Sequence, residues 1–167
     1  MEFKSILMYG LALLLIGITG INLYITMTAK GRRDKSKNSF HKVIWPIEER
    51  LLSEMKGRGL NYTVVRRLLN DKDQGIIFAS DPEKRKAVIA MADSSLHFDF
   101  ADLKESKALY KQRGNKVEKA EVRVTIKDST YIYEIASREF NPKSFLGKVL
   151  YETAEELNGL LAEIRNS

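Results

Sequence analysis

The chain has 167 residues, of which 44% are hydrophobic and 30% are charged, enough for one modest globular domain and an additional segment. It contains no cysteine, which excludes disulfides, thiolate metal sites, a cysteine nucleophile and a lipidated lipoprotein cysteine. Seven of the 28 basic residues and two of the 22 acidic residues lie within the first 42 positions, so this segment carries +5 of the net charge of +6. A near-neutral remainder is not typical of a nucleic-acid-binding domain, and we do not expect nucleic acid as the partner of the folded part.

An uncharged, largely apolar run occupies residues 5–29. Roughly 20 apolar residues are enough to cross a bilayer as a helix, which is the form that satisfies its own backbone hydrogen bonds in lipid. The run therefore predicts an N-terminal transmembrane anchor within residues 1–30. The alternative is a signal peptide, cleaved near Thr26, Thr28 or Ala29, that precedes a secreted or periplasmic domain.

Basic residues follow the apolar run almost directly. They are Lys30, Arg32, Arg33, Lys35, Lys37 and, slightly later, Lys42. By the positive-inside rule, this side of the anchor faces the cytoplasm, which predicts a single-pass protein of the cell (inner) membrane with a cytoplasmic C-terminal domain. The same six side chains are candidate contacts for the membrane lipid bilayer, at about 1 kcal/mol for each residue near an anionic surface. Anionic-lipid or nucleic-acid binding through this basic segment stays open as an alternative function.

Residues 31–45 are predicted to form a basic juxtamembrane linker, and residues 46–167 the folded domain. Apolar residues at helical spacing predict a helix from about Pro46 to Lys56, because proline is well tolerated in a first helical turn. A second short helix is predicted around Thr63 to Asn70. For Trp45, packing into the core is favoured over a place at the membrane surface.

Beyond Gly75 the apolar period becomes that of β-strands, and charged or glycine-containing turns separate the runs. The expected segments are a hairpin from Ile77 to Met91, a strand through Leu96, Phe98 and Phe100, a strand from Leu103 to Lys111 that ends near the turn at residues 113–116, and a hairpin that pairs Val122–Ile126 with Tyr131–Ile135. The Leu103 segment also fits a helix, but its neighbours favour a strand.

The last element is predicted to be an amphipathic helix, since apolar residues recur at spacings of three and four from Leu146 to Ile164. About five consecutive antiparallel strands followed by one such helix indicate an α+β fold. The expected architecture is a transmembrane helix, short helices, and a bent antiparallel sheet of about five strands that the C-terminal helix closes.

This order of elements, from Ile76 to Ile164, resembles a small pleckstrin-homology-like (PH-like) domain. It also resembles bacterial single-pass membrane proteins of unassigned function that carry such a domain after an N-terminal membrane helix. The resemblance covers a little over half of the chain. It implies a domain that binds lipids, peptides or proteins without catalysis. Phosphoinositide binders of this family cluster cations in the first hairpin loop, where this chain has Lys84, Arg85 and Lys86 together with Asp81 and Glu83.

The chain has no glycine-rich phosphate loop, no paired-histidine zinc motif and no serine elbow. Of its two histidines, His97 could join Asp93, Asp99 or Asp102 as a metal ligand, but such a group is also common on a solvated sheet surface. We expect no metal, no cofactor and no catalytic residue. The predicted function is that of a membrane-tethered, non-enzymatic interaction domain, which binds an unidentified protein partner or the membrane surface.

Overall fold

The computed structural model describes residues 18, 19, 21, 24 and 40–167, and it divides the chain into two compact units, Met1–His41 and Lys42–Ser167. The predicted anchor lies outside the described residues, apart from Ile18, Thr19, Ile21 and Tyr24, which are helical. Within the part of the chain that is described, no helix is both long and apolar enough to span a membrane.

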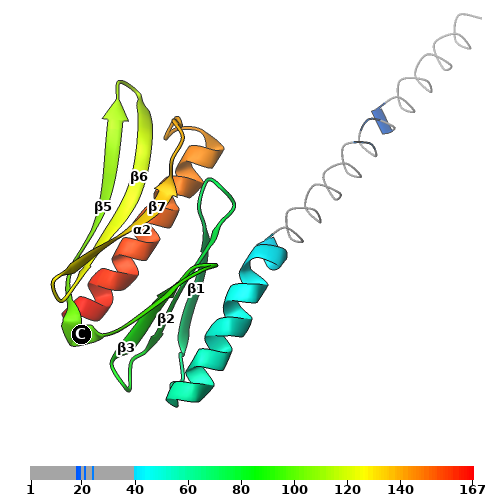
Figure 1. Cartoon of the computed structure of the whole chain (residues 1–167). Coiled ribbons are helices and arrows are strands. Elements are labelled where there is room, and N and C mark those ends of the chain that lie inside the picture. Colours follow the sequence, from blue (N-terminus) through cyan, green and yellow to red (C-terminus); the bar gives the residue numbers. More distant parts are fainter. Residues whose placement is uncertain (1–17, 20, 22–23, 25–39) are drawn as a thin grey trace, which may run out of the picture. The chain divides into compact units, whose positions relative to one another are not determined.

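The unit Lys42–Ser167 has an α+β fold, as predicted (Figure 1). It begins within a helix at residues 40–58. The remaining elements are the strands β1 (Val64–Leu69), β2 (Gly75–Asp81), β3 (Lys86–Ala90), β4 (Ser95–Asp99), β5 (Leu103–Arg113), β6 (Lys116–Ile126) and β7 (Ser129–Ala136), the short 3-10 helix η1 (Phe100–Asp102) and the C-terminal helix α2 (Phe145–Asn166). The strands form two antiparallel sheets, ordered β1-β2-β3-β4 and β5-β6-β7.

The two predicted hairpins are confirmed as β2–β3 and β6–β7, and the segment from Leu103 forms strand β5. Two other expectations are wrong. Residues 40–167 contain seven strands in two sheets rather than about five in one, and the helix expected at Thr63 to Asn70 is strand β1. Four apolar residues in that segment suit either structure, but β1 pairs along the whole of β2, from Val64 opposite Ser80 to Leu69 opposite Gly75. Pairing with an otherwise open strand edge decides the outcome.

The first helix differs from its predicted bounds as well, because Pro46 lies inside the helix at residues 40–58 rather than at its start. Proline cannot donate a hydrogen bond to the carbonyl of Lys42, which weakens the helix. Burial of Ile44 and Ile47, which are 2% and 1% exposed, offsets this cost. Trp45 is 54% exposed, so the prediction that it packs in the core is wrong.

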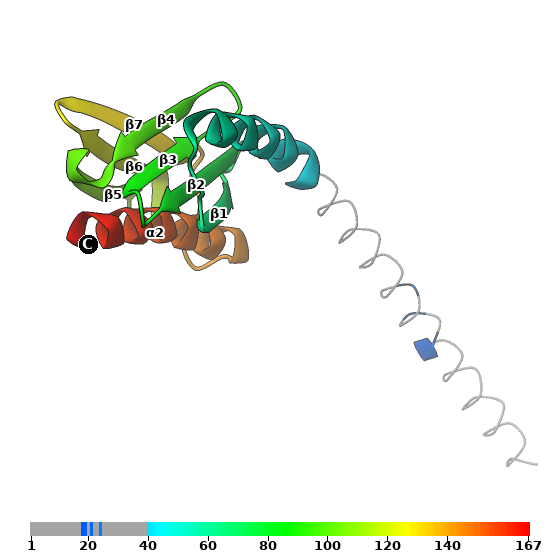
Figure 2. The same cartoon turned by 90° about the horizontal axis from the view of Figure 1, so that it is seen from below.

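This helix covers the outer face of the four-stranded sheet, on the side away from α2 (Figure 2). Gly75 permits the close approach: a Cβ atom there would lie 2.8 Å from the Cδ1 atoms of both Ile44 and Ile47. Strands β2 and β3 are consequently buried on both faces. Their continuous apolar runs, which a sheet with one solvated face would not need, follow from this double cover.

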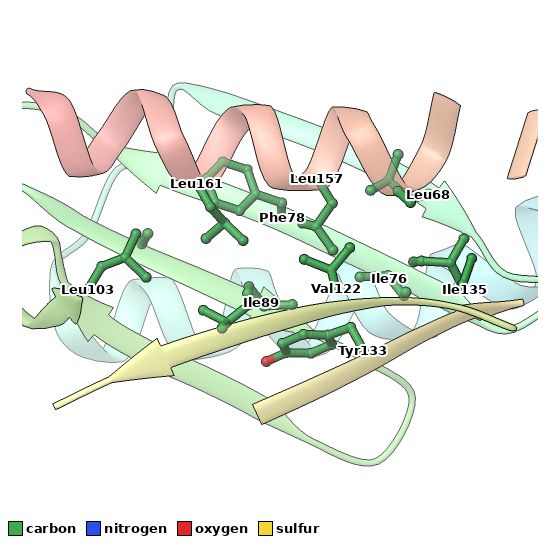
Figure 3. Packing of buried hydrophobic residues seen from close by; sticks show 14 of the residues in the cluster. Leu68, Ile76, Phe78, Ile89, Leu103, Val122, Tyr133, Ile135, Leu157 and Leu161 are labelled. Carbon is green, nitrogen blue, oxygen red and sulfur yellow. The ribbon is translucent and has the colours of Figure 1, made fainter. Parts of the chain in front are cut away.

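The inner faces of both sheets and helix α2 enclose the main core (Figure 3). Leu157 and Leu161 project from α2 toward Phe78 and Val122, and all four are buried. The predicted apolar stripe of α2 is thus confirmed from Leu150 onward. The prediction that Leu146 and Val149 belong to this buried stripe is wrong, because these residues are 60% and 41% exposed.

The first turn of α2 rests on the preceding loop instead of on the sheets. Gly147 packs so closely against the backbone of Asn141 that a Cβ atom would lie 2.0 Å from the Asn141 carbonyl oxygen. The Ser144 hydroxyl caps the helix, accepting the Gly147 N–H at 3.0 Å and donating to the same Asn141 oxygen at 2.7 Å. This arrangement holds the start of α2 outside the core.

Candidate functional site

A cavity of about 420 Å³ lies beside the ends of β3 and β4. Its polar lining consists of Arg58, Tyr62, Lys86, His97, Asp99, Asp102 and Lys127. Four of these charges are already paired, because Lys86 Nζ lies 2.5 Å from Asp99 Oδ1 and Lys127 Nζ lies 3.2 Å from Asp102 Oδ2. Apart from His97, the lining carries a net charge of only +1, from Arg58, so the cavity has neither a strong anion-binding nor a strong cation-binding field.

His97 is the only lining histidine, and both of its ring nitrogens are engaged. Nε2 lies 2.7 Å from Glu54 Oε2 and Nδ1 lies 3.1 Å from the Tyr62 hydroxyl. The Nε2–H group donates to Glu54, whereas Nδ1 accepts from the Tyr62 hydroxyl in the neutral ring and donates to it in the protonated ring. His97 therefore ties strand β4 to the helix at residues 40–58, and its side chain is only 13% exposed.

The electrostatics of this cluster fit a structural clamp. Burial acts to raise the pKa of Glu54, but the hydrogen bond and charge of His97, together with Ser95 and Arg50, outweigh it and lower that pKa. Burial raises the pKa of the Tyr62 hydroxyl to about 12, so the phenol stays neutral. Among the residues that the structure describes, no group of three or more His, Asp or Glu side chains is placed to hold a metal ion.

The cations of the β2–β3 loop bind to the domain itself. Lys84 donates to the carbonyl of Gly59, Arg85 donates to the Ser167 carbonyl at 3.1 Å, and Lys86 pairs with Asp99. The Arg85 guanidinium also lies over the Phe100 ring, 5.8 Å from its centroid. These contacts do not favour carrying phosphoinositide binding over to this loop.

Of the six basic residues singled out in the sequence, the structure places only Lys42, which is exposed in the helix at residues 40–58. The other five, Lys30, Arg32, Arg33, Lys35 and Lys37, lie outside the described residues. Their role stays a prediction.

Three exposed apolar side chains of the folded unit gather at the start of α2. Phe145, Leu146 and Val149 are 86%, 60% and 41% exposed, and we call these three residues the α2 tip. Phe145 and Val149 are one helical turn apart, and Leu146 is adjacent. Sequence reasoning assigned Leu146 and Val149 to the buried stripe and missed Phe145. The sequence feature that could have indicated the exposure of Phe145 is its position directly after the N-cap residue Ser144, before the buried stripe of α2 begins.

Basic residues flank the α2 tip in the sequence. Arg138, Lys143 and Lys148 are exposed, and none lies within 4.0 Å of a carboxylate in the described part of the chain. Of the nearby acidic residues in the sequence, Glu139 is paired with Lys116 at 2.5 Å. The other, Glu152, is exposed one turn beyond Lys148. Including both acids, Lys116 and Asp71, whose carboxylate accepts the backbone N–H of Arg138 at 3.0 Å, the tip and its surroundings carry a net charge of +1.

Comparison with protein-family models, with curated proteins and with solved structures gives no match to this chain.

Proposed function

We propose that this protein is a membrane-tethered, non-enzymatic binding domain that meets its partner through the α2 tip. The observation that carries the proposal is the joint exposure of Phe145, Leu146 and Val149 at the start of a helix whose Leu150, Leu157, Leu161 and Ile164 are buried. An exposed apolar group of this kind, rimmed by polar residues, is typical of an interaction surface. The uncharged run at residues 5–29 and its basic flank support the tether.

The arrangement of the elements supports a PH-like assignment, which we also propose. A four-stranded and a three-stranded antiparallel sheet are followed by one C-terminal helix that packs on them. This is the order in which the sequence resembles PH-like domains. A binding role without catalysis is supported by the paired charges of the cavity and by the engagement of His97.

Anionic-lipid binding by the basic segment at residues 30–42 is a second candidate function, favoured by the net charge of +5 in the first 42 residues. It is compatible with the first proposal, because both place the chain at a membrane. The two differ in the surface that makes the contact.

Absence of cysteine makes the tether directly testable. Single-cysteine variants Glu2→Cys and Ser167→Cys are treated with a membrane-impermeant maleimide, first in intact spheroplasts and then after lysis. The proposal predicts that Cys at position 2 reacts in intact spheroplasts and Cys at position 167 only after lysis. Labelling of position 167 before lysis, or a chain that lacks its first 29 residues, would favour the secreted or periplasmic alternative.

The contact surface is tested with a photo-cross-linking residue at position 146, and with a matched probe at Leu52. Both leucines are exposed helical residues, at 60% and 55%. Cross-links in native membranes are expected from position 146 and not from position 52. Equal yields from both positions, or none from position 146, would remove the α2 tip as the contact surface.

A further inference from the structure

The α2 tip lies at the end of the folded unit from which the chain continues toward the proposed anchor. Figures 1 and 2 both place the start of α2 and the start of the helix at residues 40–58 at the same end. Interactions connect the two regions: Gly75 lies against Ile44, and Asp71, in the adjoining β1–β2 turn, accepts the backbone N–H of Arg138 at 3.0 Å. Arg138 and the loop that follows it lead into the α2 tip.

The length of chain between the proposed anchor and the folded unit limits how far this end can be from a membrane. Twelve residue steps separate Lys30 from Lys42. A fully extended chain covers at most about 3.5 Å per residue, or about 40 Å over this distance. If the proposed tether holds, the end of the unit that carries the α2 tip is confined to the neighbourhood of the bilayer.

The chemistry of the tip is that of an interfacial lipid contact. Phe145, Leu146 and Val149 offer apolar side chains that insert at the boundary between headgroups and acyl chains. Arg138, Lys143 and Lys148 offer charges that complement anionic headgroups. The amino-terminal end of α2 adds its partial positive charge on the same side.

The size of the tip also favours a membrane over a protein. Stable protein interfaces use roughly 20–30 residues on each side. Three apolar residues would give only weak binding from solution, but a tethered domain needs no more, because the anchor already supplies the local concentration. We infer that the partner of the α2 tip is the anionic surface of the bilayer. This inference rests on the proposed tether and names the partner of the same surface.

The test uses the full chain reconstituted into vesicles of phosphatidylcholine, alone or mixed with phosphatidylglycerol. An environment-sensitive fluorophore is attached to Leu146→Cys or, as a matched control, to Ile132→Cys. Ile132 is 55% exposed on β7, and the β6–β7 turn lies at the opposite end of the unit from the start of α2. Circular dichroism establishes that both labelled chains are folded.

A blue-shifted emission and quenching by brominated lipid are expected at position 146 and not at position 132, and both effects should be stronger with phosphatidylglycerol. Charge reversal of Lys143 and Lys148 to glutamate should weaken the docked state at least about fivefold for each lysine.

Four results would overturn the inference, and they differ in what they leave standing. If the chain floats with the vesicles but position 146 resembles position 132, the tether survives and the lipid partner does not. Equal burial in neutral and anionic vesicles would remove the role of the anionic headgroups. A chain that fails to float with the vesicles would overturn the tether and the lipid contact together. In the photo-cross-linking experiment, a cross-link from position 146 to a protein would show that a protein, not lipid, is the partner of the α2 tip.

Discussion

Replacement of Gly147 by alanine is expected to destabilise the domain, whereas the same replacement at Gly159, in the same helix, is expected to stabilise it. A Cβ atom at position 147 would lie 2.0 Å from the carbonyl oxygen of Asn141 and 2.8 Å from its carbonyl carbon. That carbonyl cannot move freely, because it accepts the N–H of Ser144 at 3.0 Å and the Ser144 hydroxyl at 2.7 Å. At position 159 no atom lies within 4 Å of the added Cβ.

The two signs follow from competing free energies. Forcing the loop away from position 147 costs about 1–3 kcal/mol, from which the higher helix propensity of alanine recovers up to about 1 kcal/mol. We expect a net loss of about 1–2 kcal/mol. Gly159→Ala faces no such cost and should gain about 0.5–1 kcal/mol. Each kcal/mol corresponds to roughly 3–5 °C in the midpoint of thermal unfolding for a unit of this size.

Thermal unfolding of the full chain in a mild detergent, followed by circular dichroism at the helical minimum, measures both changes. Gly147→Ala should lower the midpoint and Gly159→Ala should raise it. An unchanged or higher midpoint for Gly147→Ala would mean that the loop at residues 141–144 does not hold the start of α2 in the position described. The support for the α2 tip would then be lost.

Three further predictions concern Asp71, Glu54 and Phe145. Asp71 accepts the backbone N–H groups of Ser137 and Arg138 at 2.8 and 3.0 Å. Asp71→Ala should therefore lower the free energy of unfolding in urea by about 1.5–3 kcal/mol. The control Asp128→Ala removes a side chain that is 94% exposed and should change this free energy by less than about 0.5 kcal/mol. Because the pKa of Glu54 is lowered from its ordinary value of 4.5, its carboxylate stabilises the fold above that pH and loses this contribution as the pH falls below it. Glu54→Gln should consequently be less stable than the parent near pH 7, with the difference shrinking as the pH falls below 4.5. A difference that stays constant would contradict the role given to Glu54. Phe145→Ser should leave the unfolding free energy within about 0.5 kcal/mol of the parent, whereas Leu157→Ala should lose about 2–5 kcal/mol, and a large loss for Phe145→Ser would place that side chain in the core.

Sequence periodicity was sufficient to predict the elements that bury only one face and those that are joined by a clear turn sequence. The β6–β7 hairpin follows from the alternation on either side of its short turn, where Lys127 adopts a positive φ of 54°. Helix α2 follows from its stripe, which the core buries from Leu150 to Ile164. In these cases the local pattern and the tertiary packing favour the same structure.

Other parts of the fold depend on neighbours that the local sequence does not specify. The segment at Val64–Leu69 becomes a strand because the edge of β2 is open to it. The helix at residues 40–58 continues through Pro46 because Ile44, Ile47 and Leu51 bury against the sheet. A signal for that packing was present, since the unbroken apolar run at residues 76–79 indicates a strand covered on both faces.

The candidate site was hardest to predict for a related reason. Leu146 belongs to the stripe of α2 by its spacing, and it is exposed only because the first turn of the helix rests on the loop at residues 141–144. Where a helix projects beyond its sheets is a property of the assembled domain. Periodicity cannot reveal it.

Hydrogen–deuterium exchange of the unmodified chain tests most directly whether the α2 tip meets the membrane. The chain is measured in detergent micelles and in nanodiscs that contain phosphatidylglycerol, and the exchange of peptides covering the start of α2 is compared with that of peptides covering the start of β7. We predict slower exchange in nanodiscs for the peptides that include Phe145 to Val149, and no change for those that include Tyr131 and Ile132. Equal exchange of the α2 peptides in both environments, or protection only at the start of β7, would contradict the account.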